Sequence, residues 1–76
     1  MKAKTVYCTV LIARIENAEG KKEIVHDFQV FDKEKNAIEY IDHYFDNPEE
    51  IWKDAIEIKV ISGTVHKAEP YIEVVA

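Results

Sequence analysis

The side chains best suited to hold a metal ion or to move a proton are three histidines, His26, His43 and His66. They fall on three different predicted elements, so the sequence gives no reason to place them together. Only Glu39 and His43 share the i, i+4 spacing that puts two side chains on one face of a helix. A zinc site takes three or four protein ligands, so this pair is too small. We therefore predict no metal site and no cofactor.

A catalytic nucleophile is equally hard to find. Cys8, the one cysteine, lies in the apolar run of a predicted strand, where a buried thiol is its ordinary role. Ser62, the one serine, lacks the glycine-flanked elbow of hydrolases. The only two glycines are far apart and form no phosphate-binding loop, and Arg14 is the only arginine. We predict no catalytic residue and no direct contact with nucleic acid, whose phosphates bind clustered Lys and Arg.

The strongest local feature is acidic. Residues 32–57 hold nine acidic and three basic residues, although the net charge of the whole chain is only −5. Such a segment is either a solvated surface that keeps a small protein in solution, or an anionic surface that attracts a basic protein partner. Helical spacing places Tyr40 on the exposed side of the helix. Exposed tyrosines are common at the centres of protein–protein interfaces. The predicted partner-binding residues are Glu39, Asp42, Asp46, Glu49, Glu50 and Tyr40.

The spacing of apolar residues along the chain predicts the strands and the helix that position these side chains. Residues 4–15 and 23–31 are rich in β-branched and aromatic residues and predict two strands joined as a hairpin. A helix is predicted from an N-cap at Asp32 to about Phe45, because Asn47-Pro48 then ends it. Two further strands are predicted at 55–61 and 64–75, separated by a turn at Ser62-Gly63. Pro70 is expected at a bulge or a sheet edge.

The predicted fold is a single α+β domain spanning residues 1–76, in the order β-β-α-β-β. Its four-stranded antiparallel sheet carries one helix packed on one face. Ile38, Ile41 and Phe45 form the apolar stripe of that helix. We expect the helix to cover the sheet face made of Val6, Cys8, Val10, Ile12, Ile56, Ile58 and Val60.

The other face of the predicted sheet is too apolar for a monomer in water. We therefore predict that it is covered by a second copy of the chain, in a homodimer. The dimer face would consist of Tyr7, Leu11, Ile15, Ile61, Tyr71 and Val75.

The location of the chain is predicted from two absences. The apolar run from Val6 to Ile15 contains Arg14, lacks a small-residue cleavage site and is too short to span a bilayer. A single cysteine allows no intramolecular disulfide, which small secreted domains usually carry. We expect a cytoplasmic protein that does not contact a membrane.

Together these features predict a non-catalytic protein-interaction module that binds a basic protein. In size, acidity and lack of catalytic residues the chain is similar to the small host-directed proteins of phages and mobile elements, some of which are inhibitors. That similarity is one of type and covers no aligned stretch. Two alternatives stay open. One is a ligand-binding domain or enzyme with a site at a dimer interface, using His26, His66 or Tyr71; the other is an assembly subunit that uses its sheet face or the strand near Pro70.

Overall fold

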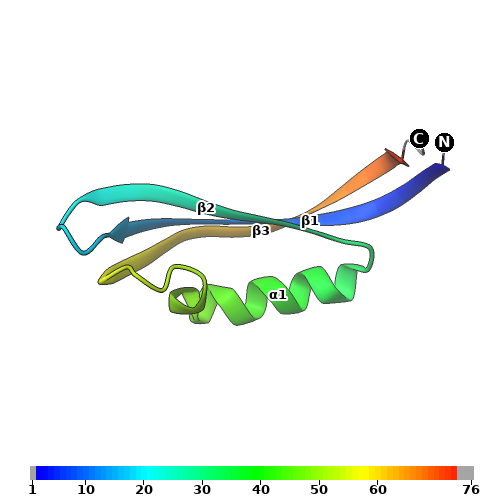
Figure 1. The fold of residues 1–76 in the computed structure, drawn as a ribbon. Coiled ribbons are helices and arrows are strands. Elements are labelled where there is room, and N and C mark those ends of the chain that lie inside the picture. Colours follow the sequence, from blue (N-terminus) through cyan, green and yellow to red (C-terminus); the bar gives the residue numbers. More distant parts are fainter. Residues whose placement is uncertain (1, 74–76) are drawn as a thin grey trace.

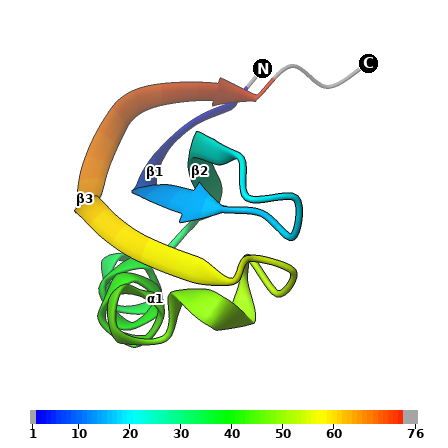
Figure 2. The same ribbon diagram turned by 90° about the vertical axis from the view of Figure 1, so that its left-hand side faces the viewer.

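The chain forms one three-stranded antiparallel sheet with one helix packed along it (Figure 1). The structure is a computed structural model that describes residues 2–73, and the side chains of residues 4–68. Its elements are β1 (Lys2–Glu16), β2 (Lys22–Phe31), α1 (Glu34–Asp46), the short 3₁₀ helix η1 (Pro48–Glu50) and β3 (Glu57–Glu73). Figure 2 shows that the sheet is strongly twisted and that α1 packs on one side of it.

The predicted four-stranded sheet is wrong, because the last two predicted strands are one. β3 runs through Ser62-Gly63 without turning, and Gly63 lies opposite Leu11 in the ladder with β1. The glycine serves close packing: a Cβ built there would lie 2.9 Å from Phe45 Cδ2 and 3.2 Å from Leu11 Cδ1. A Ser-Gly pair therefore marks a point of close approach here, and the order is β-β-α-β.

The sheet has the order β2-β1-β3, so β1 is the central strand. β1 and β2 form the predicted hairpin. In its turn, the Asn17 side-chain oxygen accepts hydrogen bonds from the backbone N–H groups of Glu19 and Lys21. Gly20 has the positive φ of 82° that glycine adopts without strain. The prediction for Pro70 is confirmed, because it lies on the edge strand β3 next to a register shift opposite Lys4 and Val6.

The ends of α1 agree with the sequence in one case and differ in the other. Its last turn ends at Asn47, whose side-chain Nδ2 donates to the His43 carbonyl oxygen at 2.8 Å. The predicted cap at Asp32 is wrong, because the N-cap position is Lys33 and no side chain caps the helix there. The first-turn Glu34 still complements the positive end of the helix dipole.

The side of α1 that faces the sheet is rotated from the predicted stripe. Ala37 is fully buried, whereas Ile38 and Phe45 remain 44% and 45% exposed. Tyr40, expected to be exposed, turns inward toward β2 and packs against Phe31, with ring centroids 5.4 Å apart. The centre of the inner side therefore lies nearer to Ala37 and Tyr40 than predicted.

The helix covers the opposite face of β1 from the one that we predicted. Thr9, Leu11 and Ala13 are fully buried beneath it, so Leu11 cannot belong to an exposed dimer face. Ile58 and Val60 of β3 do lie on the covered face, because they pair with Ile15 and Ala13. A register shift between Ile12 and Ala13 adds one residue to β3 and makes this possible. The alternation of residues along β1 does not predict which face the helix covers, because both faces are apolar.

Candidate functional site

Four carboxylates that the sequence marked for partner binding lie on α1 and on the turn that follows it. We call them the acidic surface: Glu39, Asp42, Asp46 and Glu49. All four residues are exposed. Within the described part of the chain, none of the four forms a side-chain hydrogen bond or an ion pair. Their carboxylates are therefore accessible to solvent and to a partner.

Glu50 differs from these four because the fold already uses it. Its carboxylate oxygens lie 3.1 and 3.2 Å from His43 Nε2. The His43 ring also packs edge-on against Tyr44, with centroids 4.7 Å apart. This pair links the last turn of α1 to η1 and so holds the neighbouring Glu49 close to the end of the helix.

Tyr40 lies in a network of contacts with β2 instead of in the exposed position that helical spacing predicted. Its hydroxyl donates to Asp27 Oδ2 at 2.6 Å, while Gln29 Nε2 donates to Asp27 Oδ1 at 3.2 Å. Its ring also contacts Tyr44 at 4.5 Å between centroids. Burial, then the hydrogen bond and negative charge of Asp27, raise the pKa of Tyr40 above its ordinary value. The hydroxyl is thus a fixed hydrogen-bond donor and a poor general base.

The residues predicted for the dimer face do not form one exposed surface. Leu11 is buried under α1, and Tyr7 and Ile15 are half-buried on that same covered face of β1. Ile61 is exposed at the register shift of β3. The Tyr71 side chain and Val75 lie outside the described residues.

The face of the sheet away from α1 is the apolar surface that the sequence placed on the wrong side. We call it the open face, and it is formed by alternate residues of all three strands. They are Cys8, Val10 and Ile12 of β1, Ile24, His26, Phe28 and Val30 of β2, and Ser62, Thr64 and His66 of β3. The large side chains of β2 were a usable signal, since Ile24, Phe28 and Val30 alternate with polar or half-buried neighbours.

The two histidines on the open face do not combine into a site. His26 lies opposite Ile12 and His66 lies opposite Cys8, so β1 separates them. The His66 ring instead contacts the Thr64 hydroxyl at 2.8 Å. Within the described residues, no group of three His, Cys, Asp or Glu side chains is placed to hold a metal ion. A ligand site at a dimer interface therefore stays a prediction.

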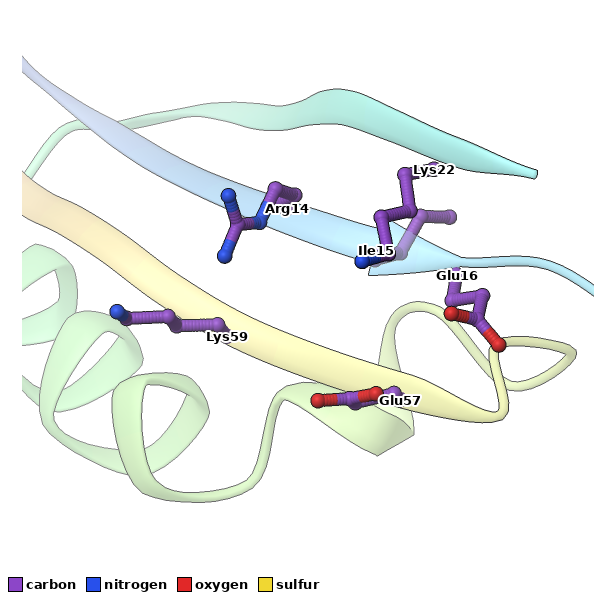
Figure 3. A pocket seen from close by; sticks show the side chains of 6 residues that line it. All are labelled: Arg14, Ile15, Glu16, Lys22, Glu57 and Lys59. Carbon is purple, nitrogen blue, oxygen red and sulfur yellow. The ribbon is translucent and has the colours of Figure 1, made fainter. Parts of the chain in front are cut away.

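Two hollows lie near the hairpin end of the sheet. The first, of about 50 Å³, is lined by charged side chains from all three strands (Figure 3). It is far smaller than the few hundred Å³ of an ordinary ligand pocket. The second is an open groove of about 640 Å³ between the hairpin turn and residues 51–55, with Trp52 in its lining. It is large enough for a ligand. Among the described residues, however, its lining contains no cluster of metal-ligating side chains and no cysteine, serine or threonine.

Comparison with known proteins finds no family model that matches the chain, no similar curated protein and no similar solved structure. No helix in the described part of the chain is long and apolar enough to cross a membrane. The function must therefore be argued from the surfaces described above.

Proposed function

We propose that this protein is a non-catalytic interaction module whose acidic surface binds a basic protein partner. The observation that carries the proposal is that Glu39, Asp42, Asp46 and Glu49 are all exposed. Within residues 4–68 no side-chain hydrogen bond or ion pair involves any of the four, although Lys35 lies four residues before Glu39 and Lys53 four residues after Glu49. Surface carboxylates on a short helix are commonly offset by lysines at i+4, which add a few tenths of a kcal/mol each. Here the i+4 positions of Glu39 and Asp42 are His43 and Asp46.

The neighbouring elements support this use of the helix. Tyr40 and Ala37 attach α1 to the sheet, and the His43–Glu50 contact attaches η1 to α1. The carboxylates therefore stand on a positioned element, so a partner that binds them orders little of this chain. Rows of fixed carboxylates also steer a basic partner toward the surface, and such steering weakens with added salt.

The test compares two triple variants with the same net charge. The first neutralises the acidic surface, and the second neutralises three other exposed carboxylates. The substitutions are Glu39→Gln, Asp42→Asn and Asp46→Asn in the first, and Glu19→Gln, Glu23→Gln and Asp32→Asn in the second. Each is used as bait in nuclease-treated host lysate, and affinity for the captured basic protein is then measured with purified components.

The acidic-surface variant is expected to lose about tenfold or more in affinity, since each desolvated charge pair contributes on the order of 1 kcal/mol. The control is expected to stay within about threefold of the native chain. Equal losses in the two variants would contradict the proposal, because net charge alone would then account for binding. Capture of no basic protein by the native chain would also contradict it.

A further inference from the structure

The open face exposes more apolar surface than a small monomer should. Ile24, Phe28 and Val30 are 64%, 55% and 53% exposed and lie on one face of β2, with His26 between Ile24 and Phe28. On β1, Val10 lies opposite Phe28 and Cys8 lies opposite Val30, and both are only half-buried. Contiguous apolar patches of this kind on a soluble monomer mark interaction sites.

The interior of a single chain is correspondingly small. Among the described side chains, the buried apolar residues are Val6, Leu11, Ala13 and Ala37, and only Leu11 is a large one. The accessible surface of the chain is 5533 Å², whereas a folded monomer of this mass has about 4,800 Å². Its radius of gyration is 14.9 Å, against about 11 Å for a compact domain of this length. A folded chain of this kind gains stability when a partner covers it.

The excess of about 700 Å² is close to the roughly 800 Å² that each partner contributes to a standard protein interface. Because the core of a single chain is small, a cover that accompanies the chain wherever it is made stabilises the fold. A second copy of the same chain meets that requirement, and a two-fold axis would apply the same patch on both sides. Two twisted apolar sheet faces pack about 10 Å apart in sandwich proteins.

We propose that the open face binds the open face of a second copy, so that the protein is a homodimer of four layers, helix–sheet–sheet–helix. Phe28 and Val10, which pair across β2 and β1, lie at the centre of the contact. Both acidic surfaces then lie on the outer sides, where each can meet a basic partner. The dimer is thus bivalent, and its existence does not depend on whether the acidic surface has the function proposed above.

The charged end of the open face has the character of an interface rim. Arg14 lies opposite Lys59, and Glu16 lies opposite Glu57, so like charges face each other across the strands (Figure 3). Like-charged cross-strand pairs are destabilising. Lys22 lies opposite Glu16 on the other side of β1. A rim with both signs suits a copy of itself better than a strongly acidic or strongly basic partner.

The first test is the mass of the native protein in solution. Sedimentation equilibrium from about 1 µM to about 1 mM covers the dissociation constants of weak and moderate dimers. The expected mass at the upper end is twice the 8.8 kDa of one chain. A mass of one chain throughout would overturn the proposal and would leave a different protein as the occupant of the open face. Assembly well beyond two copies would also overturn it.

Two variants on the open face and one matched control locate the contact. Phe28→Glu and Ile24→Glu are expected to weaken the dimer about 30-fold or more, as hot-spot substitutions do. The control is Ile56→Glu, because Ile56 is also 64% exposed but lies before β3, away from the open face. Its dissociation constant is expected to stay within about threefold of the native value. Equal effects of Ile24→Glu and Ile56→Glu would overturn the proposal.

A measurement on the native protein covers the case in which the glutamate variants do not fold. Cys8 lies on the open face and is half-buried in a single chain. Its rate of alkylation by iodoacetamide is expected to fall about tenfold or more as the protein passes from monomer to dimer. A rate that stays constant over concentrations at which the mass rises from one chain to two would overturn the proposal.

Discussion

The two faces of β1 are built from similar residues and have different surroundings. Thr9, Leu11 and Ala13 are fully buried on one face, whereas Cys8, Val10 and Ile12 are half-buried on the other. Hydropathy does not separate the two sets, since the open face holds the more apolar trio. What separates them is α1, which packs along one face only (Figure 2).

Small residues explain which face receives the helix. Gly63, Ala13 and Ala37 leave room for close approach between α1 and the sheet, and a single added methyl group at Gly63 would collide with Phe45. The open face instead carries Phe28 and Ile24, which no element of the described chain covers. One face thus packs within the chain, and the other is the face that we propose packs against a second chain.

The test with the largest expected effect compares substitutions of two adjacent residues of β1, one on each face. Leu11→Ala is expected to lower the free energy of unfolding by about 2–5 kcal/mol, because it removes the one large buried apolar side chain among the described residues. Val10→Ala, on the open face, is expected to cost less than about 1 kcal/mol at protein concentrations where the chain is monomeric. Urea unfolding measures both. Equal losses in dilute protein would show that the two faces do not differ as described.

The next test concerns the close approach at Gly63. Gly63→Ala is expected to lower the free energy of unfolding by about 1–3 kcal/mol, since the new methyl group meets Phe45 and Leu11 within 3.2 Å. The matched control is Ser62→Ala, on the open face, which is expected to change stability by less than about 0.5 kcal/mol. A stabilised Gly63→Ala protein would mean that α1 does not press against β3 at this point.

Gly63 also shows which features of the fold could be predicted from the sequence and which could not. The first two strands, the hairpin with its Asn17–Gly20 turn and the end of the helix at Asn47 follow from local chemistry and were predictable. A Ser-Gly pair has the same local signature in a turn and at a packing contact. Only the position of Phe45 above Gly63 distinguishes the two, and that position depends on residues far apart in the sequence.

The candidate site was also predictable only where local spacing determines it. Helical spacing places Glu39, Asp42 and Asp46 on the solvent side of the helix, and all three are exposed in the structure. The inward turn of Tyr40 does not follow from that spacing, because it depends on the distant Asp27. Ile38, counted as core, is left at the margin by the same rotation of α1.

A third test asks whether burial on the covered face is complete. The Thr9 hydroxyl is buried and has no hydrogen-bond partner among the described residues. Thr9→Val keeps the shape and removes this unsatisfied group, so it is expected to raise the free energy of unfolding by about 1–2 kcal/mol. Thr64→Val is the control on the open face, where the hydroxyl contacts His66 and no gain is expected. Thermal unfolding of both variants measures the difference. A destabilised Thr9→Val protein would indicate that the hydroxyl is satisfied in solution.

The smallest expected effect tests the polar contact that attaches α1 to β2. Tyr40→Phe removes the hydrogen bond to Asp27 and is expected to lower the free energy of unfolding by about 1 kcal/mol near neutral pH. The ring and its contact with Phe31 are retained, so any loss reports the hydroxyl. Tyr44→Phe is the control, since no hydrogen bond of the Tyr44 hydroxyl occurs in the described structure.

The pH dependence of that loss follows from the raised pKa of Tyr40 in the folded chain. The fold prefers the neutral phenol, so its contribution to stability is fully present below about pH 10, the ordinary tyrosine pKa, and is lost as the pH rises toward the folded value. The gap in stability between the native chain and Tyr40→Phe is therefore expected to shrink above about pH 10. Absorbance at about 295 nm should show one native tyrosine ionising later than the others, absent from the variant. A native chain whose tyrosines all ionise together would mean that Asp27 does not hold α1 against the sheet, and the covered face would then rest on apolar contacts alone.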